Sequence, residues 1–358
     1  MGLYDILWDD KIWFPENSTG TMYGWKDLQN QPGSDVYFPE LRDLNLSILL
    51  GAVLILVRFI FERFIAKPLG YYVGVSRKKP NPPPANKVLE QAHRSKLKID
   101  KTLLQTLCKQ TDMTERQIQT WLRKRKAMDS PLLIDKFAEC SWLFLFYAVA
   151  GVAGSVVLWN KPWLWQTKYC WIGWPLQNIP RDVYWYYTIE ASFYWGLVFT
   201  LFSDTKRKDF TQMAVHHFAT LVLIYFSWMM NLVRMGTLVL LLHDAADPIL
   251  ALGKLCNYSK HTLVKEICFT FFIIVWFITR LGFYPFCILW STTVEPYQYL
   301  IEKTFFTHWF FNFFLYMLMI LHLMWTYSII KVAARKFQKG DVADVRSDSE
   351  SNGISDSD

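Results

Sequence analysis

The chain has 358 residues, of which 52% are hydrophobic and 17% aromatic, and it carries a formal net charge of +7. Charged residues make up only 19% of the chain, against about 25% in a typical soluble protein. This composition excludes a disordered chain, a collagen and a disulfide-rich secreted domain. A mean hydropathy of +0.12 is nevertheless too low for a chain that lies wholly in a membrane. We therefore expect an all-α membrane protein with a sizeable polar insert.

Seven mostly apolar stretches are long enough to cross a bilayer as helices, which takes about 20 residues. The weakest is the fifth, because it contains the ionisable string HDAAD. The first has no basic region before it and no small-residue cleavage site after it, so we expect a retained span and not a signal peptide. The seven stretches lie near residues 44–66, 137–159, 183–203, 210–229, 232–253, 264–290 and 305–330.

The distribution of basic residues predicts the orientation of these spans. The loop 67–136 carries 16 Lys and Arg against 6 Asp and Glu, and three further basic regions alternate with regions poorer in Lys and Arg. Because basic loops stay in the cytosol, the segment 1–43 is expected in the lumen and the acidic tail 331–358 in the cytosol. The sequon that begins at Asn17 then lies on the lumenal side, where it is a glycosylation site.

The insert 67–136 predicts a small helical module. After a Pro-rich linker, the stretch Lys101 to Met128 has the pattern of two helices, and Thr114 and Gln117 form a capping box at the start of the second. That helix resembles the C-terminal part of a homeodomain, but Lys124 stands where the family has an adenine-reading Asn. The space before it leaves the first homeodomain helix cramped or missing. We therefore expect no DNA binding, and favour a module docked on anionic lipid or on the membrane domain.

Two polar strings, DFTQMAVHH and HDAAD, lie inside the fourth and fifth predicted spans. Ionisable groups are costly in a bilayer, so each is a functional hypothesis. His216 and His217 would lie about 10 Å from the cytosolic side. In a continuous helix, His243 and Asp247 share a face, and Asp244 can share it with Asp247. Since the two spans should pack antiparallel, the two strings can reach similar depth.

The chemistry of these strings suits acyl transfer. A neutral imidazole can take a proton from an attacking amine or itself attack a thioester, and a nearby carboxylate fixes its tautomer. The chain has no G-x-S-x-G elbow, and no Cys lies in either string. Two alternatives remain: satisfied hydrogen bonds between helices, and a zinc or iron site. Adjacent His side chains point in different directions on a helix, so we expect neither a metal nor another cofactor.

Other polar groups have less specific interpretations. Glu190 is expected to line the same cavity or to pair with Arg280, whereas His308 and His322 lie alone among aromatics and are expected to be structural. The basic link between the third and fourth spans either attracts the phosphates of a nucleotide-bearing donor or only satisfies the positive-inside rule. Its cations are Lys206, Arg207 and Lys208.

Several strings together resemble one family, the ceramide synthases or Lag1 longevity-assurance homologues. The strings include WFPENST, FERFIAKP, KPWLW, YYTIEASFYWGL, SDTKRKDF, VHH, RMGTLVLLLHDAAD and KLCNY. The resemblance implies an endoplasmic reticulum N-acyltransferase that joins the acyl group of a fatty acyl-CoA to the amino group of a sphingoid base. The family's catalytic His pair matches His216 and His217, and its Lag1 carboxylates match Asp244 and Asp247. The family fold implies six spans, residues 137–330, around a long lipid cavity, plus the first span.

The resemblance also carries expectations about regulation and partners. Family members vary their acyl-chain preference in the link before the last span, here STTVEPYQYLIEKT, and they commonly form homo- or heterodimers. The tail DVRSDSE matches the family's acidic C-terminal pattern, which makes Ser347 and Ser349 candidate phosphorylation sites. A non-catalytic lipid sensor or translocation partner with the same fold is the alternative to the enzyme.

Overall fold

The computed structural model describes residues 8–15, 23–77, 81–95, 100–201, 204, 209–300 and 305–339 of the chain. Every regular element in these ranges is a helix, which confirms the all-α prediction. Some predicted sites fall outside the described residues and stay predictions, namely Asn17, Lys206, Arg207, Lys208, Ser347 and Ser349.

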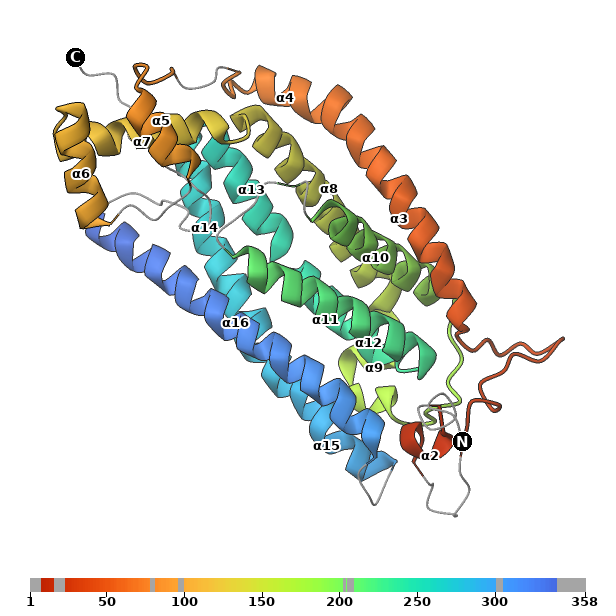
Figure 1. The fold of residues 1–358 in the computed structure, drawn as a ribbon. Helices are drawn as coiled ribbons and strands as arrows, with labels where there is room; N and C mark the ends of the chain where they lie inside the picture. Colours follow the sequence, from red (N-terminus) through yellow and green to blue (C-terminus); the bar gives the residue numbers. More distant parts are fainter. Residues whose placement is uncertain are drawn as a thin grey trace.

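Long helices form one elongated bundle, with shorter helices at its ends (Figure 1). Four of the long units are single helices: α8 (Leu133–Trp159), α10 (Arg181–Thr200), α11 (Phe210–Met229) and α16 (Phe306–Lys339). The other three are composite. They are α3 (Leu41–Phe61) continued by η1 (Glu62–Ala66) and α4 (Lys67–Tyr72), α12 (Val233–Asp244) followed by α13 (Asp247–Tyr258), and α14 (Thr262–Trp276) continued by η3 (Phe277–Leu289) and α15 (Trp290–Tyr299). The short elements outside the polar insert are α2 (Asp10–Trp13), α9 (Pro162–Trp165) and η2 (Thr167–Cys170).

Five of the long units in the described ranges are long and apolar enough to cross a membrane, so the chain is a multi-pass membrane protein. They are 41–72, 133–159, 233–258, 262–299 and 306–336. Large apolar side chains stay exposed along the outer faces of these units, such as Phe59 on α3 and Ile320 on α16, each 59% exposed. Such an outer surface is suited to lipid and not to water. The predicted third and fourth spans correspond to α10 and α11, which are not among the five.

Helix α10 packs closely along α3 within the same bundle. A Cβ atom on Gly51 of α3 would lie only 2.9 Å from the carbonyl oxygen of Ser192 on α10. Small residues at such a crossing let two backbones approach, as is typical of helices packed in lipid. At the other end of the contact, Arg58 forms ion pairs with Glu62 at 2.6 Å and Asp204 at 2.7 Å.

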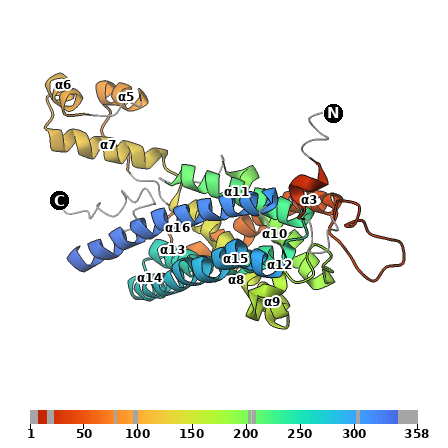
Figure 2. The ribbon, with the colours of Figure 1, turned by 90° about the horizontal axis from the view of Figure 1, so that it is seen from below.

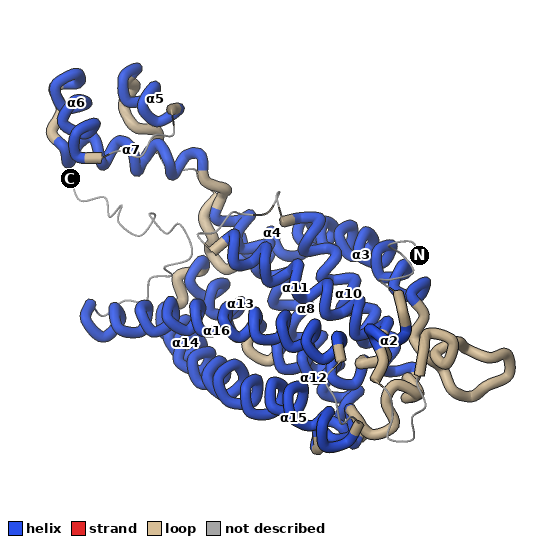
Figure 3. Tube along the Cα trace, turned by 60° about the horizontal axis from the view of Figure 1, so that its bottom comes forward, coloured by secondary structure: helices blue, strands red, loops and turns tan. Residues whose placement is uncertain are grey.

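The polar insert is a three-helix unit that stands off one end of the bundle (Figures 2 and 3). Its helices α5 (Lys87–Arg94), α6 (Lys101–Thr111) and α7 (Glu115–Asp129) enclose a small apolar core. The two predicted helices are confirmed as α6 and α7, and the predicted capping box is present at the start of α7.

A short first helix, α5, lies before α6, so of the two expectations for this space, cramped or missing, the first holds. Asn86 caps α5 by accepting hydrogen bonds from two backbone N–H groups, and Leu89 is fully buried in the core of the insert. The Pro-rich linker also packs on this unit, because the indole N–H of Trp121 donates to the carbonyl of Pro84 at 2.6 Å. The described part of the linker, residues 81–86, therefore packs against the insert.

The fifth predicted span is two helices and not one. Pro248 has no N–H to donate to the carbonyl of Asp244, four residues earlier, so the helix ends there. Helix α13 begins again at Asp247 after a two-residue turn. The expectation that His243 and Asp247 share one face assumed a continuous helix, and the break removes its basis.

We name the two ends of the bundle by what lies there. At the insert end, Ile134 and Phe137 of α8 pack with Leu255 and Tyr258 of α13, next to the chain that leads into the insert. At the opposite end, the N-terminal segment docks on α16, where the hydroxyl of Thr307 donates to the carbonyl of Trp13 at 2.6 Å.

Candidate functional site

Four histidines from three helices meet in the middle of the bundle. His216 and His217 lie on α11, and their ring centroids are 5.6 Å apart. The ring of His216 stacks on that of His243 from α12 at 6.1 Å, with 24° between the planes. His243 in turn contacts His322 of α16, with ring centroids 5.1 Å apart. The structure therefore brings both predicted polar strings together and adds a residue that we had expected to be structural.

Hydrogen bonds determine the tautomers of the last two rings. Nδ1 of His243 lies 2.6 Å from the carbonyl oxygen of Val239, so this nitrogen must carry the proton and donate. Its Nε2 then has a lone pair, which accepts the N–H of His322 Nε2 at 3.2 Å. His322 Nδ1 is left with a lone pair that has no hydrogen-bond partner. His322 thus orients the ring that stacks on His216.

Arg280 stabilises the end of α12 that carries His243. The helix break leaves the carbonyls of Leu242 and His243 without intrahelical donors. The guanidinium of Arg280, from η3, donates to these two oxygens at 2.9 and 2.7 Å and is itself only 2% exposed. It also lies 3.9 Å from the carboxylate of Asp247. No ion pair joins Arg280 to Glu190, the pairing considered from the sequence.

Glu190, on α10, instead faces Asp244. Each of these residues is about 1% exposed, and their carboxyl groups are close enough to interact electrostatically. Both carboxylate oxygens of Glu190 and Oδ2 of Asp244 are buried without a hydrogen-bond partner. Asp247 lies outside this pair, and its side chain is 29% exposed. The two carboxylates of the HDAAD string thus lie in different surroundings.

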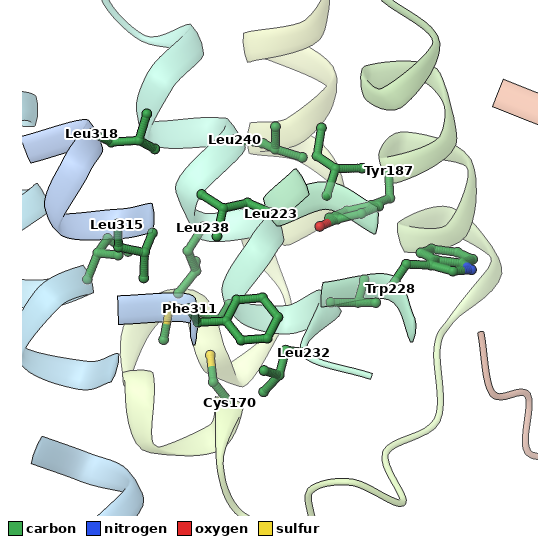
Figure 4. Packing of buried hydrophobic residues seen from close by; sticks show 14 of the residues in the cluster. Cys170, Tyr187, Leu223, Trp228, Leu232, Leu238, Leu240, Phe311, Leu315 and Leu318 are labelled. Carbon is green, nitrogen blue, oxygen red and sulfur yellow. The ribbon is translucent and has the colours of Figure 1, made fainter. Parts of the chain in front are cut away.

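A narrow apolar cavity of about 60 Å³, the first cavity, runs from this cluster toward the opposite end of the bundle. His243 and Tyr194 lie at its inner end, and Trp174 and Phe305 line the other. Figure 4 shows much of its wall, which includes Tyr187, Leu223, Leu232, Leu240, Phe311, Leu315 and Leu318 from α10, α11, α12 and α16. Its apolar lining with a few polar groups at the inner end is typical of a ligand site.

Across the described ranges, no group of three or more His, Cys, Asp and Glu side chains has an arrangement that holds a metal ion. All six cysteines are free thiols. Burial raises the pKa of the Cys170 thiol, so this residue is a poor nucleophile.

Sequence reasoning missed three contributors to the cluster, all aromatic or His residues that surround it. His322 was recognised only as a lone polar residue, and its partner lies 79 residues away in sequence. Tyr194 packs 6.1 Å from His217, and Trp325 packs 5.5 Å from His216. The sequence offers no signal for these contacts, because they depend on how α10 and α16 cross α11 and α12.

Comparison with known proteins assigns the family. Residues 136–331 match the TLC domain family model, which is more than half of the chain. Human ceramide synthase 5 is 39% identical over 352 residues, covering 98% of this chain and 88% of the relative. Bovine ceramide synthase 4 is 39% identical, covering 97% and 87%. Ceramide synthase hyl-2 of Caenorhabditis elegans is 34% identical, covering 95% and 93%. The chain belongs to the ceramide synthase family.

The TLC match covers both helices of the broken span and all four histidines of the cluster. Helix α3 and the insert lie outside it, although the ceramide synthase relatives match these parts as well. The resemblance drawn from the sequence strings is therefore confirmed.

Proposed function

We propose that this protein is a ceramide synthase, which transfers the acyl group of a fatty acyl-CoA to the amino group of a sphingoid base and releases dihydroceramide or ceramide and CoA. The observation that best supports this function is the polar cluster at the inner end of a long apolar cavity. This arrangement places ionisable groups next to the reacting carbonyl of a bound acyl donor. The relatives named ceramide synthase support the same reaction.

The length of the first cavity suits one acyl chain. Its wall along α12 runs from the N-cap residue Leu232 to His243, 11 steps of 1.5 Å that span about 16 Å. One leaflet is about half of a hydrocarbon core roughly 30 Å thick, so it is similarly deep. A chain of ordinary membrane-lipid length therefore fits between the cluster and the aromatic end of the cavity.

The histidines supply the chemistry on the covalent route. A ring nitrogen of His216 attacks the thioester carbonyl, the carbon–sulfur bond breaks, and the CoA thiolate leaves and takes up a proton. The amine of the sphingoid base then attacks the acyl-imidazole, loses a proton and releases the imidazole. His217 and His243 hold the reacting ring from two sides.

On the direct route, His216 instead takes a proton from the amine while it attacks the thioester. Intact-mass measurement after incubation with acyl-CoA alone separates the two routes. An acyl adduct that disappears when a sphingoid base is added supports the covalent route, and a purified active protein with no adduct refutes it.

The function itself is tested by His216→Ala and His217→Ala, each assayed for ceramide synthesis in membranes from cells that lack other ceramide synthases. We expect each variant to lose at least about 100-fold in rate, the contribution typical of an acid–base group. His261→Ala is the matched control, because His261 is exposed on the turn between α13 and α14. Full activity in folded variants would favour the alternative, a lipid sensor or translocation partner.

The topology follows from the same proposal. Helices α10 and α11 also cross the membrane, which gives seven spans, with residues 137–330 as the catalytic domain and the N-terminus in the lumen of the endoplasmic reticulum. Insertion of a glycosylation tag at either terminus, scored by glycosidase digestion, tests this orientation. Loss of native glycosylation in Asn17→Gln supports a lumenal N-terminus, and a glycosylated C-terminal tag contradicts it.

A further inference from the structure

The indole of Trp325 lies directly against the imidazole that the proposed mechanism uses. Trp325 is on α16, three residues beyond His322, and its ring packs 5.5 Å from that of His216, with 81° between the planes. The side chain is only 7% exposed, and its indole N–H has no hydrogen-bond partner. Because a buried N–H group without a partner is costly, this donor points to an acceptor that a ligand brings.

Other donors of the same core are used by the protein itself. Trp276 packs 6.4 Å from Trp325, and its own indole N–H donates to the hydroxyl of Thr326 at 2.9 Å. The guanidinium of Arg280 donates to the two carbonyls at the end of α12. These groups hold the fold together, whereas the N–H of Trp325 makes no such bond within the described chain and stays available to a ligand.

Of the four histidines in the cluster, His216 is the one that a ligand can reach. It is partly exposed, whereas His217 and His243 are each 5% exposed and His322 is 1% exposed. The ring of His216 also stacks on His243, which lines the inner end of the first cavity. A reacting carbonyl must lie about 3 Å from both its nucleophile and the donor that binds its oxygen. The spacing of 5.5 Å between the imidazole and the indole of Trp325 suits a carbonyl held between them.

We propose, on the basis of the proposed function, that Trp325 is a catalytic residue whose indole N–H donates a hydrogen bond to the oxyanion formed at the thioester carbonyl. When a nitrogen attacks the carbonyl carbon, the electron pair of the C=O bond moves to the oxygen, which accepts the N–H. When the carbon–sulfur bond breaks, that pair re-forms the carbonyl and the thiolate leaves. The oxyanion arises whether the attacking nitrogen belongs to His216 or to the sphingoid base, so the assignment holds on both routes.

The surroundings of the indole strengthen this contact. A preorganised donor in a low-dielectric core stabilises a developing charge more than it would in water. Because the full charge on the oxygen exists only in the tetrahedral state, the donor stabilises that state more than the bound substrate. Its loss should therefore lower kcat and leave KM almost unchanged.

The experiment compares Trp325→Phe with the wild type, purified in a neutral detergent. The variant keeps an aromatic ring against His216 and removes only the N–H donor. We expect kcat to fall about 100-fold, the loss typical of one oxyanion donor, while the acyl-CoA KM stays within about twofold. Trp309→Phe is the matched control and should keep the wild-type kcat, because Trp309 lies on the same helix, is 61% exposed and does not line the first cavity.

Two CoA analogues separate a catalytic role from a structural one. A trifluoromethyl ketone analogue of acyl-CoA forms a tetrahedral adduct with a nucleophile, and a thioether analogue has no carbonyl oxygen. Trp325→Phe should bind the ketone about 100-fold more weakly than the wild type does and should bind the thioether equally well. Equal weakening for both analogues, or an unchanged kcat, would overturn the proposal.

A third outcome would assign the indole to the other substrate. If Trp325→Phe raises only the KM of the sphingoid base, the N–H binds a hydroxyl of that base and the oxyanion assignment is wrong. A wild type that makes no ceramide counts against the proposed function, whereas binding of the ketone analogue tests Trp325 separately.

Discussion

Leu315→Trp should shorten the acyl chain that the enzyme accepts. Leu315 is 3% exposed and lines the first cavity seven residues from His322, which places it about 10 Å from the cluster along α16. An indole at this level closes the outer part of the cavity toward Thr307, a further eight residues or about 12 Å along the helix. Chains that end above the indole still fit, and longer chains lose the burial of their last methylenes.

The magnitude follows from the burial of methylene groups. Each buried methylene contributes about 0.8 kcal/mol, which is about a fourfold factor in kcat/KM. A chain that loses three methylenes from the cavity should therefore lose about 60-fold in kcat/KM relative to a chain that still fits. Competition among acyl-CoA donors of increasing length, with ceramides resolved by mass spectrometry, measures this ratio within one reaction.

Ile320→Trp is the matched control, because Ile320 lies on the same helix, is 59% exposed and does not line the cavity. It should leave the distribution of chain lengths unchanged. If Leu315→Trp lowers kcat/KM equally for all chain lengths, or leaves the distribution as it is in the wild type, the first cavity does not hold the acyl chain.

Three further predictions concern the groups around the site and the insert. His322→Leu should lower kcat about tenfold or more, because the ring that stacks on His216 loses its orienting donor, and His322→Gln should restore part of the rate through its amide N–H; equal loss in both variants would contradict the orienting role. Arg280→Met should lower the free energy of unfolding by about 3 kcal/mol or more in thermal or denaturant unfolding, because two carbonyls at the end of α12 lose charged donors; an unchanged midpoint would refute the capping role. Hydrogen bonds from Arg125 lower the pKa of Glu90 in the folded insert. Glu90 therefore stabilises the insert above its unfolded-state pKa, and this stabilisation is lost as the pH falls through its lower folded-state pKa. Hydrogen exchange in α5 and α7 should then rise in acid, and Glu90→Gln should weaken this dependence on pH.

The helical elements were predictable from the sequence because the length of an apolar stretch can be read directly from consecutive residues. Each predicted span corresponds to a long helical unit of the described chain, although only five of these units meet the criteria of length and hydropathy for a span. The same reasoning found the capping box of α7, because Thr114 and Gln117 are only three residues apart. It missed α5, since eight polar-rich residues bury little except Leu89. A helix this short depends on its tertiary contacts more than on its own sequence.

The candidate site was only partly predictable for a related reason. The strings that contain His216 and His243 could be recognised because ionisable residues are rare in apolar segments. Their contact required two helices to cross, and His322 entered from a third helix far along the chain. The partner of Arg280 was also hidden, because the carbonyls that it binds become available only where the helix breaks.

The broken span explains how so many polar groups are stable in the middle of an apolar bundle. A continuous helix satisfies its own carbonyls and leaves a buried Arg280 without acceptors, whereas the break at Pro248 exposes two carbonyls within reach of its guanidinium. The arginine and the break therefore stabilise each other, and neither is favourable alone in a low-dielectric core. Because α12 ends at this point, His243 and Asp244 are held at a helix terminus and not within a regular helix. The mutual dependence predicts that Pro248→Ala, which permits a continuous helix, would leave Arg280 with fewer acceptors and so disturb the alignment of His243 with His216.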